Sequence, residues 1–317
     1  MPEKHGIKPT RHGFGDGLVD VGRLNNNLIA LGADITGSVS MNKFAEQFAD
    51  RFYSLGIAEQ NIAGVAAGLA LSGKIPVFST YGVFSAMRDL DQIRISICYN
   101  NVHVVIGGAH AGISVGPDGA THQALEDIAV MRSLPNMTVL SPCDATQTRL
   151  ATIEAVQKIQ GPVYIRFGRE GVPDFTDAEQ DFSPGKAQVL KEGDDIALFA
   201  TGHLVWEALT AEEILREKHN IRAAVVNFHT IKPLDKETAT YWATRCGKVL
   251  TAEEHQVTGG FGSAVAECLV QSQPVPMHIL GVNDSFGESG QPAELMKKYG
   301  LTSDDIVNHA LKLLNHA

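Results

Sequence analysis

The sequence predicts an α/β fold of two domains, each a mostly parallel sheet covered by helices on both faces. Short, continuously apolar segments alternate with longer segments of helical periodicity, which is typical of parallel strands buried on both sides. The alternation runs twice, before and after a stretch at 170–195 that is rich in Gly, Pro, Asp and Ser. Because such a composition is typical of a linker or crossover, we expect domains at 1–182 and 183–317.

Each element of the first domain follows from its own residue pattern. A strand is expected where apolar residues run without interruption, and a helix where they recur every three or four positions. After an irregular N-terminal segment, the expected strands are 28–34, 76–81, 102–108, 137–140 and 163–167, and the expected helices are 55–73, 84–97, 123–133 and 145–157.

The second domain repeats the pattern. The expected strands are 196–200, 222–228, 248–251 and 277–282, and the expected helices are 205–218, 235–244, 262–271 and two more near the C-terminus. We interpret the glycine-rich segment 259–262 as a turn that opens a helix, because it is too short for a dinucleotide site. The cluster Glu253, Glu254 and His255 is interpreted as a solvated strand end rather than a metal site. The sequence thus assigns no chemistry to this domain.

Composition narrows the classes of partner. A net charge of -10 argues against nucleic acid or an anionic membrane as a partner. The four cysteines form no CxxC motif, so we expect buried, reduced thiols rather than zinc ligands or disulfides. The sequence has neither a signal-peptide pattern nor an apolar run of membrane-spanning length, so a cytoplasmic location is expected.

The predicted helix at 55–73 is unusual because it is almost entirely small or apolar, yet carries one acid, Glu59. The residues that share its helical face are Ile62, Ala63, Ala66 and Ala70. A face of small residues favours close approach by another backbone or a flat ligand. A buried carboxylate is costly without a partner, so a dedicated partner for Glu59 is expected. The alternative is that Glu59 caps the helix through backbone amides.

Polar and aromatic residues gather after the first-domain strands, where open parallel sheets bind their ligands. Taken singly, each has an ordinary structural interpretation: a core aromatic, a neighbour of a helix cap or an exposed ion pair worth little. Together they place acid, aromatic, histidine and arginine groups at one sheet edge. These residues are Asp34, Ser38, Tyr81, Phe84, His110, Asp118, His122 and Arg169, with Arg11 from the N-terminal segment.

Four segments resemble one family. Residues 56–60 (GIAEQ), 79–81 (STY) and 116–123 (GPDGATHQ) resemble the pyrimidine-binding domain of transketolase and its thiamine-diphosphate relatives. Residues 283–290 (NDSFGESG) resemble transketolase C-terminal domains, so the resemblance covers nearly the whole chain.

The resemblance lacks one part of a full transketolase, the preceding domain that binds the diphosphate through Mg²⁺. That domain carries a GDG followed by an asparagine, and here Gly15-Asp16-Gly17 is followed by Asn42. No apolar strand precedes this GDG, so we interpret it as unrelated and expect no metal ligands on this chain. The chain resembles the C-terminal half of a split transketolase, which implies a separate N-terminal chain that holds most of the Mg²⁺ site.

The resemblance implies a role for each site residue. Glu59 would hydrogen-bond the aminopyrimidine ring of thiamine diphosphate, Tyr81 and Phe84 would stack on and enclose that ring, and Asp34 would lie beside the cofactor. His122, which we count with Glu59 as catalytic, would contact sugar hydroxyls together with Asp118. Met87 falls where many relatives place a further aromatic residue, so this wall of the pocket is expected to differ.

The phosphate of a sugar substrate would be bound by Arg11, Ser38, His110 and Arg169, which match the set that transketolases use. Arginine suits a phosphate because its planar fork donates paired, charge-assisted hydrogen bonds. Deoxyxylulose-phosphate synthases usually carry arginine where Phe84 stands and lack the histidine at His110, so both positions favour transketolase.

The expected function is that of a subunit of a two-chain transketolase of the pentose phosphate pathway, which transfers a two-carbon ketol unit between sugar phosphates. The expected assembly is α2β2, with self-association through the Glu59 face of its helix. The alternatives are a deoxyxylulose-phosphate synthase-like or specialised-sugar subunit, a 2-oxo acid dehydrogenase E1 β subunit, and, least favoured, a non-catalytic regulatory subunit.

Overall fold

The computed structural model describes residues 1–315 and confirms the predicted α/β class. Within this range a seven-stranded sheet has the order β12-β6-β7-β5-β4-β2-β3, and its central strands are parallel. Its strands are β2 (Leu28–Gly32), β3 (Phe52–Ser54), β4 (Ile75–Tyr81), β5 (Val105–Ala109), β6 (Thr138–Leu140), β7 (Val163–Arg166) and β12 (Thr230–Lys232).

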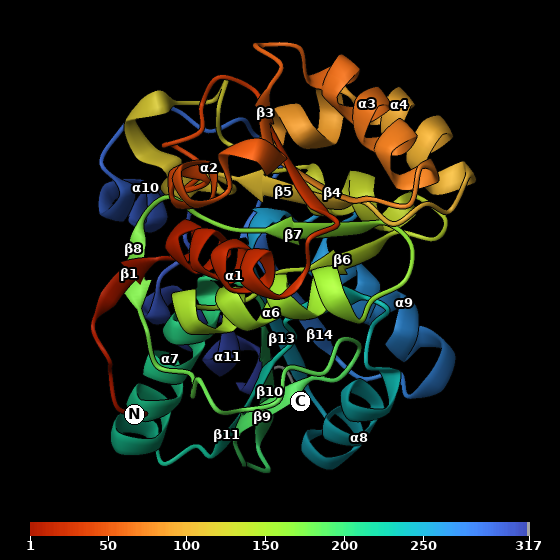
Figure 1. Ribbon diagram of the computed structural model, residues 1–317. Helices are drawn as coiled ribbons and strands as arrows, with labels where there is room; N and C mark the ends of the chain where they lie inside the picture. Colours follow the sequence, from red (N-terminus) through yellow and green to blue (C-terminus); the bar gives the residue numbers. More distant parts are fainter. Residues whose placement is uncertain (316–317) are drawn as a thin grey trace.

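Helices cover both faces of this sheet because its strands are apolar on both sides. Alternate residues of β2 show this: Leu28 and Ala30 lie in the core beneath α1 (Thr10–Leu24) and α6 (Ala145–Gln157), whereas Ile29 and Leu31 face α3 (Glu59–Leu71). In Figure 1, α1 and α6 lie between the two sheets, and α3 and α4 (Leu90–Gln92) cover the outer side.

Helix α1 corrects the expected irregular start. The sequence pattern concealed it, because glycines at positions 13, 15 and 17 lower helix propensity. Tertiary packing requires all three: a Cβ on Gly13 would lie 1.9 Å from the carbonyl oxygen of Ala145, one on Gly15 would lie 2.1 Å from that of Ser40, and one on Gly17 would lie 2.8 Å from that of Arg149. The GDG segment at 15–17 therefore lies within a helix that packs against α6, and not in a loop that follows a strand.

Two other expected helices differ in the structure. The segment at 84–97 forms the π-helical turns Phe84–Arg88 and Ile93–Tyr99 on either side of α4. The helix expected at 123–133 begins later, as α5 (Asp127–Ser133). The reason is that the Gln123 side chain donates to the carbonyls of Ile113 and Glu288, while Ala124 pairs with Ala111.

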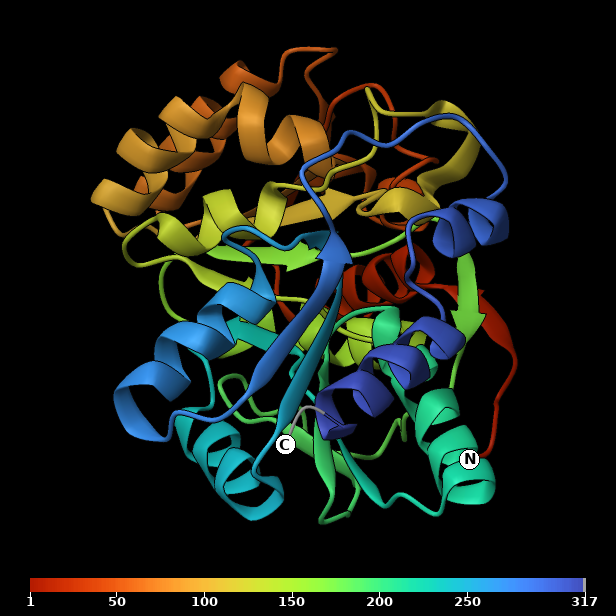
Figure 2. The ribbon, with the colours of Figure 1, turned by 180° about the vertical axis from the view of Figure 1, so that it is seen from behind.

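The second sheet has the order β14-β13-β10-β11-β9. Its strands are β9 (Gln188–Lys191), β10 (Ile196–Ala200), β11 (Ala223–Asn227), β13 (Val249–Gln256) and β14 (Met277–Val282), and its helices are α7 (Leu204–His219), α8 (Lys236–Cys246), α9 (Phe261–Ser272), α10 (Pro292–Lys298) and α11 (Ser303–Asn315). Figure 2 shows β13 beside β14, with α9 and α11 on opposite sides of the pair.

The sequence pattern missed two short antiparallel pairs, one of which joins the two parts of the chain. β12 leaves the second part and pairs with β6 of the first sheet. β1 (Ile7–Pro9) pairs with β8 (Gly171–Pro173) beside the start of α1. The division expected at 182/183 stays a prediction. Among the described residues, no helix combines the length and apolar character needed to cross a bilayer.

Candidate active site

Glu59 is the first residue of α3, and its side chain is only 4% exposed. The sequence predicts a dedicated partner for Glu59 without naming it, and in the structure this partner is Arg88. Its guanidinium donates to the Glu59 carboxylate at 2.9 Å. The π-helical turn brings Arg88 back across Phe84, with the guanidinium carbon 4.1 Å from the ring centre. Sequence analysis missed Arg88, because its approach to Glu59 depends on this turn rather than on helical spacing.

The face of α3 that carries Glu59 packs within the chain itself. Ile62, Ala63 and Ala66 are buried in one core cluster with residues of β4 and of the π-helical turns. This corrects the expectation that the Glu59 face meets a second copy of the chain, since its small side chains are already covered. The opposite face is the open one: a Cβ added at Gly64 or Gly68 would meet nothing within 4 Å.

An aromatic cluster lies at the ends of β4 and β5, next to Glu59. The Tyr81 ring stacks on His110 at 4.3 Å with an interplanar angle of 16°, and lies 5.8 Å from Phe84. His122 meets both Tyr81 and Phe84 edge-on at 5.5 Å. The structure thus brings together four residues that the sequence separates into three segments.

Basic residues lie on the other side of the aromatic cluster, and Arg11, His110 and Arg169 are called the basic cluster below. Arg11 donates to the carbonyl oxygen of Ser38 at 2.9 Å and lies 3.4 Å from Nε2 of His110. Arg169 donates to Asp118 at 2.8 Å. The sequence predicts Ser38 as a site residue, and in the structure its backbone carbonyl is the atom that contacts Arg11.

The electrostatics of this cluster favour an anion. Burial, followed by the charges of Arg11 and Arg169, lowers the pKa of His110 to about 4, so the imidazole is neutral near pH 7. Burial and the charge of Arg169 likewise lower the pKa of Arg11. Nδ1 of His110 and Nε of Arg11 are buried and have no hydrogen-bond partner among residues 1–315. Crowded positive charge with unused polar atoms fits a negatively charged ligand.

Asp34 is the expected site residue that stands apart. It follows β2 in a left-handed backbone conformation (φ 64°), and its side chain is exposed. No hydrogen bond within residues 1–315 joins it to the aromatic or basic cluster.

Asp89 is a second buried acid beside Glu59, and sequence analysis missed it. Burial raises the pKa of Asp89 to about 7; its own backbone amide opposes that shift, the charge of Glu59 adds to it, and Arg88 opposes it. Neither carboxylate oxygen has a hydrogen-bond partner among the described residues. An unpaired buried acid of this kind costs stability when it ionises.

We therefore expect Asp89→Asn to stabilise the isolated chain at pH 8 relative to wild type much more than at pH 4. The folded-state pKa of about 7 lies above the ordinary value of 3.8 for an aspartate, so wild-type stability falls as pH rises between them. At ~1.4 kcal/mol per pKa unit, the loss is at most about 4 kcal/mol. Urea unfolding at both pH values tests this, with the exposed Asp91→Asn as control; identical pH dependence in Asp89→Asn and wild type would contradict it.

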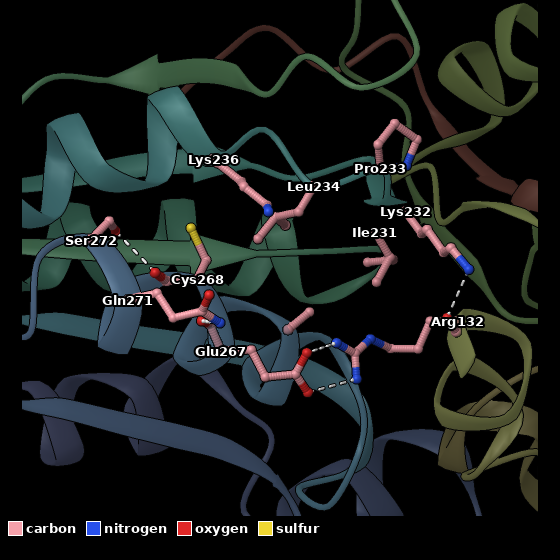
Figure 3. Close-up of a pocket in the computed structure, with 11 residues that line it drawn as sticks. Arg132, Ile231, Lys232, Pro233, Leu234, Lys236, Glu267, Cys268, Gln271 and Ser272 are labelled. Carbon is pink, nitrogen blue, oxygen red and sulfur yellow. Dashed lines mark hydrogen bonds and ion pairs between the residues drawn. The ribbon is translucent and has the colours of Figure 1, made fainter. Parts of the chain in front are cut away.

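A hollow of about 420 Å³ lies away from this site, between α5, α9 and the segment after β12. Figure 3 shows that two of its three lining cations are engaged within the protein: Arg132 forms a paired contact with Glu267, and Lys232 donates to the carbonyl of Arg132. Nothing here points to a ligand. Among residues 1–315, no group of three His, Cys, Asp or Glu side chains could hold a metal ion.

Comparisons with known proteins agree with this geometry. The family model for the transketolase pyrimidine-binding domain matches residues 8–174, and that for the transketolase C-terminal domain matches residues 185–306. A putative transketolase C-terminal section of Methanocaldococcus jannaschii is 41% identical, with 96% of each chain covered. A 6-deoxy-6-sulfo-D-fructose transketolase subunit of a Clostridium species is 40% identical over 97% of this chain and 94% of its own.

Among solved structures, a split-gene transketolase described as an inactive β4 tetramer is 48% identical. It superposes with a TM-score of 0.91 and covers 98% of this chain and 99% of its own. The resemblance of the four sequence segments is thereby confirmed over both halves of the chain. The chain belongs to the transketolase family and carries its pyrimidine-binding and C-terminal domains.

Proposed function

We propose that this chain is the C-terminal subunit of a two-chain transketolase that transfers a two-carbon ketol unit from a ketose phosphate to an aldose phosphate. The observation that carries the proposal is the direct contact between the aromatic and basic clusters. His110 stacks on Tyr81 and lies against Arg11, so one site joins a flat apolar wall to a phosphate-sized patch of positive charge.

The residues fit thiamine diphosphate, the cofactor that the family implies. Tyr81 and Phe84 offer flat apolar walls, and Glu59 places a buried carboxylate next to them. Oγ1 of Thr80 is buried beside Tyr81 with no partner in the described chain. When bound, the cofactor supplies the electron sink for carbon–carbon bond cleavage. As the resemblance to the pyrimidine-binding domain implies, we assign the Mg²⁺ and diphosphate contacts to the partner chain.

The chain's own residues would bind, orient and move protons. Glu59 would hold and exchange a proton at its carboxylate when the cofactor is bound; Arg88 donates to Oε1, which leaves Oε2 for that role. His122, edge-on to both aromatic rings, faces the space where sugar hydroxyls would lie, with Asp118 on the same loop. Asp34 is proposed only to border the cofactor, because its side chain is exposed.

Arg11, His110, Arg169 and the Ser38 segment would hold the substrate phosphate. Arg11 and Arg169 each have a guanidinium donor engaged by the protein, which orients the fork and leaves further N–H groups for phosphate oxygens. The neutral His110 can donate one hydrogen bond without adding to the crowded charge.

The preferred sugar has a second candidate. Similarity to the 6-deoxy-6-sulfo-D-fructose transketolase subunit, at 40%, nearly equals that to the Methanocaldococcus jannaschii protein, at 41%. A specialised sugar with another anionic group therefore stays an alternative to the pentose phosphates. Two deoxyxylulose-phosphate synthases are 38% identical over 94% of this chain and 47% of their own, so that alternative also stays open, although Phe84 and His110 favour transketolase. The phosphate-binding set does not favour a 2-oxo acid dehydrogenase subunit.

We propose an α2β2 assembly with an N-terminal chain. The inactive β4 tetramer of the 48% identical relative supports a need for a partner. The open face of α3 and its neighbourhood offer a surface for self-association, since Ile57 is 75% exposed, Leu71 69% and Tyr99 83%.

The four cysteines are buried and unpaired by disulfides, which supports the cytoplasmic location.

Co-expression with a neighbouring N-terminal transketolase reading frame tests the function. Xylulose 5-phosphate and ribose 5-phosphate are supplied with thiamine diphosphate and Mg²⁺, and sedoheptulose 7-phosphate is measured. Product from the pair, but from neither chain alone, would support the proposal. Product from this chain alone would show that the partner is not needed, and product only from another donor sugar would favour the specialised enzyme.

Arg11→Met should raise the KM for a ketose phosphate about 10–100-fold, because each charge-assisted hydrogen bond contributes about 1.5–3 kcal/mol. Methionine keeps much of the length of the side chain and removes only the fork. The KM for the same ketose without its phosphate should stay unchanged, and Arg23→Met, on the exposed end of α1, serves as control. Equal effects on both ketoses would show that Arg11 does not bind phosphate.

A further inference from the structure

Two buried side chains of the second part of the chain lie directly behind the basic cluster. Glu254, in β13, is 3% exposed, and one of its carboxylate oxygens accepts the backbone amide of Ser114. The other oxygen lies 3.5 Å from Nδ1 of His203, at the start of α7. This corrects the interpretation of 253–255 as a solvated strand end, because all three side chains are buried: Glu254 and His255 contact Ser114 and Ala129 of the first domain, and Glu253 contacts the start of α9.

His203 continues the connection to the two arginines. Its Nε2 lies 3.4 Å from Oγ1 of Thr10, the residue before Arg11. The same Thr10 oxygen accepts the amide of Gly168 at 2.7 Å, and Gly168 precedes Arg169. One pair of side chains thus contacts all three segments of the basic cluster: the starts of the Arg11 and Arg169 segments and the loop that carries His110, Asp118 and His122.

Two backbone segments pack tightly against Glu254 and His203. A Cβ on Gly112, where φ is +90°, would lie 2.3 Å from the Glu254 carboxyl carbon. A Cβ on Gly168 would lie 2.1 Å from the His203 ring. Both loops therefore approach the pair as closely as a backbone can, and these two glycines make that approach possible.

The charge of Glu254 is compensated where it lies. Burial alone would raise its pKa, but the hydrogen bond and charge of His203, then Arg166, then the Ser114 amide lower it below the ordinary value. Arg166 also donates to the backbone carbonyl of Glu254 at 2.8 Å. An ionised, fully engaged carboxylate is a rigid anchor, since any movement would leave a buried charge without partners.

We propose that Glu254 and His203 are positioning residues that hold three of the four phosphate-binding segments, those of Arg11, His110 and Arg169, at their mutual spacing. This gives the second domain a part in substrate binding without contact with substrate. The claim about phosphate binding rests on the proposed function. The placement of the segments does not depend on that function. A substrate phosphate needs its donors held to within a fraction of an ångström, so a shift of one segment should weaken phosphate binding selectively.

Glu254→Gln and His203→Gln in the co-expressed two-chain enzyme test the proposal, with Glu254→Ala as the stronger change. Glutamine at 254 can still accept the Ser114 amide but loses the charge that faces His203. Glu253→Ala is a matched control: Glu253 is equally buried and adjacent, but its carboxylate accepts the amides of Phe261 and Gly262 at the start of α9.

We expect the KM for the ketose phosphate to rise roughly tenfold or more in Glu254→Ala and His203→Gln, as for a lost charged hydrogen bond, and less in Glu254→Gln. The KM for the unphosphorylated ketose should rise less, because only one of the three segments, the loop of His122 and Asp118, contacts sugar hydroxyls. The apparent affinity for thiamine diphosphate should stay within about twofold of wild type. Equal rises for both ketoses, or the same selective rise in Glu253→Ala, would overturn the proposal.

Hydrogen exchange in the isolated chain separates this proposal from the proposed function. If the wild-type pair has no ketol-transfer activity, the function fails, but amides at 112–118 and 168–170 still report on the placement of the segments. Faster exchange there in Glu254→Gln and His203→Gln, with unchanged exchange in Glu253→Ala, would support positioning. Wild-type exchange rates in both variants would overturn it, whatever the activity.

Discussion

Replacing Glu59 with glutamine is expected to lower kcat of the two-chain enzyme by about 10²–10⁴-fold, the usual contribution of a positioned acid–base group. Glutamine has nearly the same shape and keeps a hydrogen-bond acceptor for Arg88, but it cannot exchange a proton with the cofactor. The KM for sugar phosphate should change little, because the basic cluster lies on the far side of Tyr81 and His110.

Steady-state assays with the partner chain present measure this effect, and Glu46→Gln, an exposed acid of α2 (Asn42–Gln47), serves as control. Binding of thiamine diphosphate should be measured as well, because a variant that merely unfolds would lose it together with activity. Near-normal turnover in Glu59→Gln would exclude the proposed mechanism while leaving the family assignment intact.

Removing the Asp127 carboxylate is expected to destabilise the isolated chain by about 3–5 kcal/mol, the cost of leaving a buried charge without its partner. Asp127 is fully buried, accepts from Arg166 at 2.9 Å and from the Tyr164 hydroxyl at 2.8 Å, and has no access to solvent. In Asp127→Ala the Arg166 guanidinium, whose side chain is 7% exposed, would lose its hydrogen-bonded carboxylate partner and keep only the charge of Glu254.

Urea unfolding of three variants checks this: Asp127→Ala, Arg166→Met and the double variant. The double variant should be less destabilised than the two single changes together, because it leaves neither charge alone. Arg169→Ala breaks the half-exposed pair with Asp118 and should cost no more than about 1 kcal/mol. Additive single effects at Asp127 and Arg166 would contradict the coupling.

The sequence by itself determined the family, the α/β class and the order of the longer elements. Short, continuous apolar runs such as those at β5 and β10 are typical of strands buried on both faces, so the sequence predicts them without tertiary information. The sequence also placed Tyr81, Phe84, His110 and His122 at one sheet edge, because strand ends and loop residues follow directly from the alternation.

Tertiary structure alone decided what contacts these residues. Helix α1 carries too many glycines to be predicted from propensity, and forms because α6 packs against its backbone. Arg88 reaches Glu59 only through a π-helical turn, whose longer hydrogen-bonded loop departs from the spacing of an α-helix. Glu254, 140 positions from Ser114, is buried only because the two domains close over it. Local sequence carries the pattern of burial along one element, whereas long-range pairing depends on how separate elements meet.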